Sequence, residues 1–434
     1  MIFFVILLIL ISFLAFRNKR IICPSNVVFG NYFLYLVFPA TLFYFLEWIS
    51  WEYVLPWGKM NDWAGVSQEA ILAYLYVFTL FFYLTRGMEV LIDRAEQPDI
   101  IREHRARPAA LWVCALLLLV GCAYFFQVTG GIDAWTSDYS ETYLSKKKGY
   151  GLLNFFLIMW SNFLAFWVGF YCRTAPRRSL LLLLFVLLVL ACCAFVQGVK
   201  SRIFMFGIFF SLPWLAVARL SLKQGVCLFL GFMVLFSGAM YVRSNGFYNT
   251  PEMLLEYFLT YFNTIFLHDM ILQDMQPDYL LTMGYPINKW LSLIGVSSPD
   301  YLHDISRWLT AMYFPSQWFD ESATQQWPIE TELYLNYGSY VFWVVPIALY
   351  AVFICTLYAL RFRGGPVFLF ICMSELFMFL SMFRGSMLQW IILFNVLFYL
   401  MLMLGQRLMF ARVKPLPKAG EQAVETVQNG QGAA

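Results

Sequence analysis

Long, uninterrupted apolar blocks are the feature that most constrains the fold of this chain. The block from Ser179 to Gln197 contains no charged residue and does not alternate as a half-buried strand would. Hydrophobic residues make up 61% of the 434 residues and charged residues only 13%, which favours lipid rather than water as the solvent. Because a backbone in hydrocarbon must satisfy its hydrogen bonds internally, these blocks predict transmembrane helices. We therefore expect an all-α, polytopic membrane protein.

About eleven segments are predicted to cross the membrane. They lie near residues 1–16, 27–46, 70–85, 109–127, 150–172, 179–197, 203–218, 225–241, 337–360, 366–383 and 385–405. This pattern divides the chain into helices 1 to 8 (1–241), a large loop region (242–336), helices 9 to 11 (337–405) and an unstructured tail (406–434). The first segment has neither a positively charged start nor a small-residue cleavage site, so it is expected to remain as an anchor.

The distribution of basic residues predicts the orientation. If the cluster Arg17 to Arg20 is cytoplasmic, alternation of the spans places the other dense basic clusters inside as well, as the positive-inside rule requires. Ten Lys and Arg residues then fall outside, leaving 19 of the 29 inside. The loop at 242–336 and the N-terminus are expected outside, and the C-terminus inside.

Four of the outer cations are candidate functional residues, because they lie at membrane edges between closely spaced spans. Lys200 and Arg202 are expected in a turn that begins at Gly198, Arg243 follows the eighth span, and Arg384 separates the last two. Ionisable groups at membrane depth usually face a cavity or a partner. Arginine forks match phosphate oxygens, so the group suits a lipid-borne diphosphate and would stabilise it as a leaving group without a metal or another cofactor. The alternative is that each arginine extends to the lipid headgroups.

A second candidate is the segment from Trp327 to Gly338, before the ninth span. If it is helical, Glu332 and Asn336 share one face, and the carboxylate could act as a general base on a sugar hydroxyl. The alternative is an acidic helix start that is favoured by the helix dipole.

The loop region supplies further candidate substrate contacts. His268 and His303 each precede an aspartate and could act as a base or a phosphate donor, although surface histidines without a role are the alternative. Arg307 is a further candidate contact in the same loop. The spacing of the histidines matches no metal motif. The loop is rich in aromatic residues, which predicts that it is folded and lies on the membrane surface.

Several function classes lack their sequence signatures. The chain has no P-loop and no DxD motif of the kind used with nucleotide sugars, which argues against ATP-driven transport and a cytoplasmic nucleotide-sugar transferase. No basic stripe interleaved with aromatic residues suggests a nucleic-acid partner. The nine cysteines include no CxxC pair, so neither disulfides nor a zinc site are expected.

Three short motifs resemble the Wzy-type oligosaccharide repeat-unit polymerases of bacteria, the group that includes O-antigen polymerases. The motifs are the Gly198 to Arg202 turn, the segment Glu332-x-Tyr334-x-Asn336-Tyr337-Gly338 and the pair Arg384-Gly385. With about eleven spans and a late outer loop, the likeness extends over most of the chain. Lys200 is an additional cation in the first motif, and Tyr337 replaces the usual Phe in the second.

The resemblance implies a GT-C-like fold and a metal-independent polymerase in the bacterial inner membrane. Such an enzyme joins undecaprenyl-diphosphate-linked oligosaccharide units at the periplasmic face, and a chain-length regulator is a possible protein partner. Two alternatives stay open. An O-antigen ligase would use the same donor, and a flippase or other transporter would place charges along a central path rather than at one face.

Overall fold

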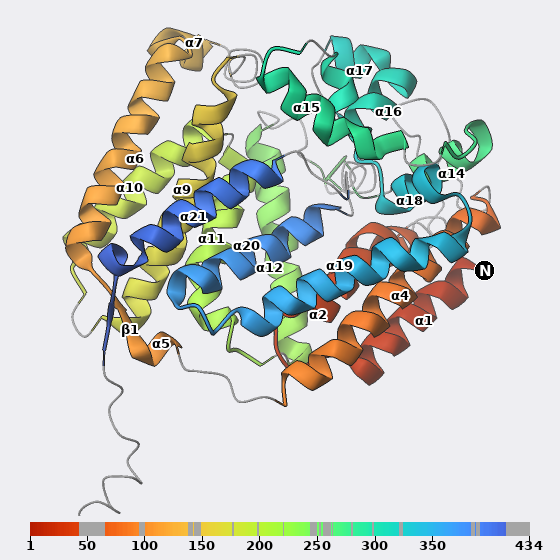
Figure 1. Cartoon of the computed structure of the whole chain (residues 1–434), viewed down its shortest axis with the longest axis horizontal. Coiled ribbons are helices and arrows are strands. Elements are labelled where there is room, and N and C mark those ends of the chain that lie inside the picture. The colour runs from red at the N-terminus through yellow and green to blue at the C-terminus, as the bar shows by residue number, and fades with distance from the viewer. Residues whose placement is uncertain are drawn as a thin grey trace, which may run out of the picture.

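The computed structural model describes the greater part of the chain. The described residues are 1–42, 66–94, 100–137, 142, 149–175, 178–197, 199–219, 221–243, 250, 253–254, 262, 264–278, 281–296, 299–320, 324–382, 387 and 391–413. Over this part the structure is 82% helical, which confirms the all-α class. Figure 1 shows the helices packed side by side in one bundle, with a group of shorter helices at one end.

Six helices in the described residues are long and apolar enough to cross a membrane, so the chain is a multi-pass membrane protein. They are α4 (Gln68–Ile92), α6 (Pro108–Val128), α9 (Gly151–Thr174), α10 (Leu180–Gln197), α19 (Tyr340–Leu360) and α21 (Ile392–Met409).

The other five predicted segments contain helix as well. They correspond to α1 (Ile2–Phe16), α2 (Pro24–Tyr32) continued by the π-helix η1 (Phe33–Val37), α11 (Val199–Leu215), α12 (Leu222–Arg243) and α20 (Pro366–Met382). Two predicted boundaries differ clearly from the structure: α4 continues to Ile92 rather than ending near residue 85, and α21 begins at Ile392 rather than near residue 385. Leu388, Trp390 and Ile391, just before α21, are apolar as well, so hydropathy alone did not locate the start of the helix.

Large apolar side chains cover the outside of the bundle. Leu181 of α10, Val345 of α19 and Leu404 of α21 are 70%, 62% and 86% exposed. A soluble monomer rarely exposes apolar surface on this scale, whereas lipid tails match it. The inward faces instead bury aromatic side chains such as Phe81 and Trp167.

Two of the buried helices approach unusually closely. Gly169 of α9 faces the backbone of Phe210 in α11, and a Cβ atom at this glycine would overlap the carbonyl oxygen and lie 2.8 Å from the carbonyl carbon of Phe210. Small residues at helix contacts allow such an approach in membranes.

The described part of the loop region is folded, as predicted. It forms α14 (Ile265–Asp274), the 3-10 helix η2 (Leu281–Gly284), α15 (Tyr285–Leu293), the 3-10 helix η3 (Asp300–His303), α16 (Ile305–Tyr313), α17 (Pro315–Phe319) and α18 (Ile329–Tyr337). These helices share a small core of their own, made of Leu267, Ile271, Tyr285, Ile305, Leu309, Trp327 and Leu335.

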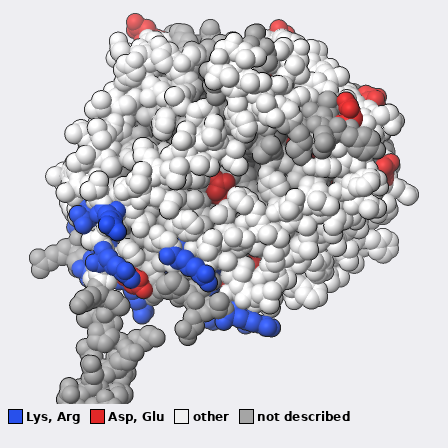
Figure 2. All heavy atoms as spheres, viewed as in Figure 1, with Lys and Arg blue, Asp and Glu red and all other residues white. Residues whose placement is uncertain are grey.

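The two ends of the bundle differ in charge. At one end, α5 (Ile100–Glu103) leads into β1 (His104–Ala106), which pairs antiparallel with β2 (Phe410–Arg412) so that His104 lies opposite Arg412. Figure 2 shows Lys and Arg gathered at this end of the visible face. Asp and Glu lie mainly toward the opposite end, which carries α7 (Gly131–Ser137) and the helices of the loop region.

Candidate active site

Helix α18 holds both carboxylates of the segment from Trp327 to Gly338, Glu330 and Glu332, and its ends follow from the local sequence. Pro328 precedes the first helical residue, and Gly338 ends the helix with a φ of +61°. Glycine adopts this left-handed backbone without the steric cost that a Cβ atom brings. The backbone amide of Gly338 donates to the carbonyl oxygen of Tyr334 at 2.8 Å, and the chain then turns into α19. The glycine of the motif therefore has a structural role.

Glu332 is buried in a hydrogen-bonded network that also contains Asn336. The hydroxyl of Thr282 donates to Oε1 of Glu332 at 3.0 Å, and the backbone amide of Met387 donates to Oε2 at 2.5 Å. The side-chain amide of Asn336 donates to Thr282 Oγ1 at 2.5 Å and its Oδ1 accepts from the Thr282 amide at 2.8 Å. The prediction that Glu332 and Asn336 share a helix face is confirmed.

This network determines what Glu332 can do. Burial raises the pKa of Glu332 to about 8, although the hydrogen bonds from Met387 and Thr282 oppose the rise. Both carboxylate oxygens already accept a hydrogen bond, and the side chain is 3% exposed. Glu332 therefore connects α18 to η2 and to the α20–α21 connection at Met387.

Glu330 lies two residues earlier on α18 and faces a different environment. Its Oε1 accepts a hydrogen bond from the hydroxyl of Tyr32 in α2 at 2.5 Å. Burial raises the pKa of Glu330 to about 7, and the bond from Tyr32 opposes the rise. Both glutamates are in the first turn, where the helix dipole favours acids, but burial and contacts with distant elements go beyond a dipole preference.

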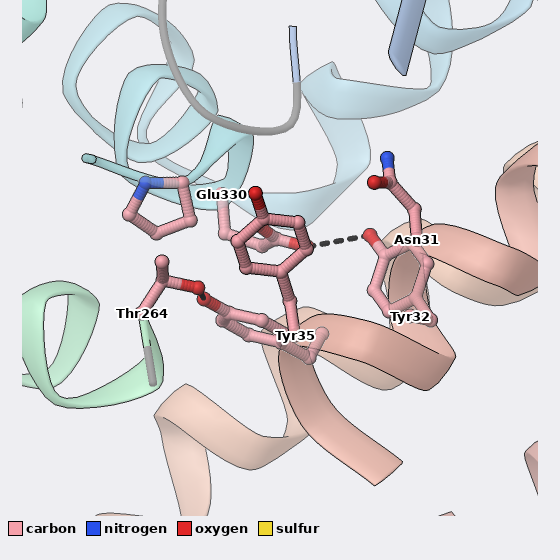
Figure 3. A pocket seen from close by; sticks show the side chains of 7 residues that line it. Asn31, Tyr32, Tyr35, Thr264 and Glu330 are labelled. Carbon is pink, nitrogen blue, oxygen red and sulfur yellow. Dashed lines mark hydrogen bonds between the residues drawn. The ribbon is translucent and has the colours of Figure 1, made fainter. Parts of the chain in front are cut away.

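Glu330 borders a small pocket. We call it the Glu330 pocket. It is lined by Asn31, Tyr32, Tyr35, Tyr74, Thr264, Pro328 and Glu330. Figure 3 shows Tyr35 beside Glu330, with Asn31 and Tyr32 on one side and Thr264 on the other. The hydroxyls of Tyr74 and Thr264 are 2.9 Å apart. The space between these side chains is about large enough for one water molecule.

Asn31 is the lining residue whose hydrogen-bonding capacity is incompletely used. It is 4% exposed, and within the described residues its Nδ2 has no hydrogen-bond partner. Buried amide groups are almost always paired with protein or water.

His268 is fully buried, so the surface alternative for this residue is wrong. Its Nδ1 lies 3.1 Å from the hydroxyl of Thr331 in α18. Burial lowers the pKa of His268 to about 3, which keeps the ring neutral at physiological pH. Desolvation therefore disfavours a positively charged ring, and the roles of base or phosphate donor stay predictions.

His303 is also buried, at 1% exposure, so the surface alternative is wrong here too. Burial lowers its pKa, and Lys289 adds to the effect. Its Nδ1 lies 3.5 Å from Oδ1 of Asp300, which makes this a contact of a neutral ring rather than an ion pair. The guanidinium of Arg307 lies 5.9 Å from the ring centre of Trp318. These contacts place His303 close to Asp300 of η3 and Arg307 close to Trp318 of α17.

The described residues cover the four predicted cations only in part. The structure places Lys200 and Arg202 in the first turn of α11, which corrects the expected turn. Long basic side chains form helix readily and can still extend from a helix end toward water, so helix is favoured here. Arg243 is the last residue of α12. The side chains of Lys200 and Arg243, and the whole of Arg384, lie outside the described residues.

The structure adds residues to the site that sequence reasoning missed. Tyr32 and Glu330 are 298 positions apart, and Thr282 and Glu332 are 50 apart. No short motif links such partners. Only Glu330 had a signal, because it precedes the motif glutamate by two positions.

The described residues contain no group of three or more His, Cys, Asp or Glu side chains arranged to hold a metal ion. No protein-family model, curated protein or solved structure matches this chain.

Proposed function

We propose that this chain is a lipid-dependent glycosyltransferase that polymerises undecaprenyl-diphosphate-linked oligosaccharide repeat units. The observation that carries the proposal is the burial of two carboxylates, Glu330 and Glu332, on one short helix at the acidic end of a bundle of membrane-crossing helices. A general base with a pKa near the working pH gives the most effective proton transfer. The motif that resembles the Wzy-type polymerases lies on the same helix.

The proposed reaction needs one base and one anion-binding group. An acceptor sugar hydroxyl attacks the anomeric carbon of the donor chain, and a new C–O bond forms as the C–O bond to the diphosphate breaks. The bonding electron pair leaves with the diphosphate, and the hydroxyl proton passes to a carboxylate of α18. Arg202, Arg243 and Arg384, together with Lys200, are proposed to bind the diphosphate and stabilise its developing charge.

We also propose the number of spans, the fold, the membrane and the orientation. The chain has about eleven spans and a GT-C-like arrangement in a bacterial inner membrane, with the N-terminus and the loop region in the periplasm and the C-terminus in the cytoplasm. A chain-length regulator is the proposed protein partner. The separation of basic and acidic ends supports this orientation. Reporter fusions after Lys223 and within residues 270–320 should report opposite compartments, and the same compartment for both would refute the topology.

Deleting the gene and displaying the surface polysaccharide on a gel tests the function. Loss of a polymerase should leave a single repeat unit on the acceptor, because transfer and export continue without chain growth. Long chains that remain on the lipid carrier would instead indicate a ligase. Repeat units that accumulate inside the cell would indicate a flippase, and an unchanged ladder would refute all three functions.

A further inference from the structure

We propose that helix α15 lies in the membrane surface at the acidic end of the bundle, with one row of apolar side chains among the lipids. This row, which we call the α15 stripe, consists of Ile287, Leu291, Ile294 and Val296. The aromatic content of the loop region predicts contact with the membrane surface, and the stripe identifies the helix and the face that make this contact. Contact of the stripe with lipid does not depend on the proposed function.

The exposed apolar side chains of the described loop region gather at α15. Six large hydrophobic side chains of this region are exposed, and four of them form the stripe, with exposed fractions of 51%, 37%, 77% and 49% in sequence order. The other two, Met312 and Phe319, are single side chains on α16 and α17. Single exposed apolar residues are ordinary on a protein surface, whereas a group of them marks an interaction site.

Helical geometry places the stripe on one face. Its first three residues are at positions i, i+4 and i+7 of one helical pattern, so they lie in a row. The other side of α15 packs on the protein. Tyr285 belongs to the core of the loop region, and Nδ2 of Asn288 donates to the carbonyl oxygen of Leu302 at 3.3 Å. The loop region therefore holds one face of α15 and leaves the apolar face exposed.

The position of α15 in the bundle indicates lipid as the occupant. Helix α7 begins three residues after the membrane-crossing helix α6 ends, so α7 marks the edge of the membrane. Figure 1 shows α15 at the same end of the bundle as α7. Helix α15 also carries Lys289 and Trp290, residue types that are common where hydrocarbon meets the headgroups. Short amphipathic helices at this depth bury their apolar face in the lipid.

The size of the stripe argues against a protein in its place. A stable protein–protein interface takes about 20–30 residues from each side, whereas the stripe offers four side chains. Lipid tails need no such area, because each apolar side chain that leaves water contributes separately.

Contact with lipid at α15 also acts on α18. The helix η2 ends at Gly284 and α15 begins at Tyr285, so no linker separates the two. Thr282 of η2 donates to the carboxylate of Glu332 and accepts from the amide of Asn336. Anchoring α15 in the membrane surface therefore holds Thr282 against α18 and fixes the depth of this network relative to the lipid.

The first test locates the stripe in the full-length protein, reconstituted in vesicles of phosphatidylethanolamine and phosphatidylglycerol. A fluorescent amino acid is introduced at residue 291 by codon suppression, because nine native cysteines prevent selective thiol labelling. A second protein carries the probe at residue 320, where an exposed Asp follows α17. Nitroxide groups on the lipid should quench the probe at 291, and aqueous iodide should not. The reverse is expected at 320.

The second test compares matched double variants. Leu291→Gln with Ile294→Gln makes the stripe polar, and Met312→Gln with Phe319→Gln makes the same change at exposed positions outside it. In vesicles, the backbone amides of η2 should lose protection from hydrogen exchange in the stripe variant and keep it in the control. Because all four positions are exposed, both variants should fold, which elution as a single species in detergent verifies.

Three results would contradict the inference. Iodide quenching at 291 equal to that at 320 would show that the stripe faces water. A probe at 291 that neither quencher reaches would show that a partner protein or a second copy of the chain covers the stripe instead of lipid. Unchanged exchange of η2 in the stripe variant would refute the link to α18. None of these measurements involves catalysis, so their failure is separate from a failure of the proposed polymerase.

Discussion

Thr282 links two turns of α18 by its contacts with Glu332 and Asn336. Its hydroxyl donates to the carboxylate and accepts from the amide, and its backbone amide donates to Asn336. All three residues are buried. Removing one partner from such a network leaves another polar group without a hydrogen bond, which costs about 1–3 kcal/mol.

We therefore predict that Asn336→Ala lowers the unfolding free energy by about 1–3 kcal/mol, because the amide of Thr282 loses its acceptor. Thermal unfolding of the purified protein in detergent measures the change. The control is Gln273→Ala, which removes an exposed partner of Asp269 on α14 and should change stability by no more than about 0.5 kcal/mol. Equal melting temperatures for the two variants would contradict the role assigned to the network.

Helical spacing was sufficient to place Glu332 and Asn336 on one face, because positions four apart are neighbours on any helix. Their common partner could not be predicted, since Thr282 is separated from Glu332 by 50 positions and belongs to no motif. The burial of His268 and His303 could not be predicted from the sequence either. A polar residue beside an aspartate in a loop gives no indication of burial, and both rings are inside the folded loop region.

The helices themselves were predictable from apolar runs, whereas their contacts were not. Every predicted span contains helix in the described residues, yet no pattern in α9 or α11 identifies Gly169 as the point of closest approach. Hydropathy measures transfer into lipid and does not distinguish a helix that faces lipid from one that faces other helices. The buried side of α9 and the exposed side of α10 therefore look alike in sequence.

The α9–α11 contact leads to a second stability prediction. Gly169→Ala should destabilise the protein by about 1–3 kcal/mol, because the added methyl group overlaps the backbone of Phe210 and the helices must separate. Gly207→Ala on α11 is the control, since a Cβ atom there has no neighbour within 4 Å. Thermal unfolding in detergent again provides the comparison. A Gly169→Ala protein at least as stable as the control would show that the helices are not in close contact.

At the scale of the whole molecule, the bundle separates its charges between two ends and places the α18 carboxylates toward the acidic one. Charge clusters along the sequence predicted this separation, because each cluster follows or precedes an apolar run. The fold of the loop region onto that end could not be predicted in detail, since it depends on contacts such as that of Tyr32 with Glu330. The proposed polymerase uses this arrangement to bring an extracytoplasmic acceptor to a lipid-borne donor.

The most direct test of the polymerase uses the purified wild-type protein in lipid vesicles with the lipid-linked single repeat unit as its sole substrate. The measurement follows lipid-linked dimers and longer chains together with free undecaprenyl diphosphate. We predict that one diphosphate is released for each new sugar linkage, because every transfer breaks one donor bond and leaves the acceptor lipid attached. A repeat unit that stays intact, or diphosphate release without chain growth in the presence of folded protein, would contradict the account.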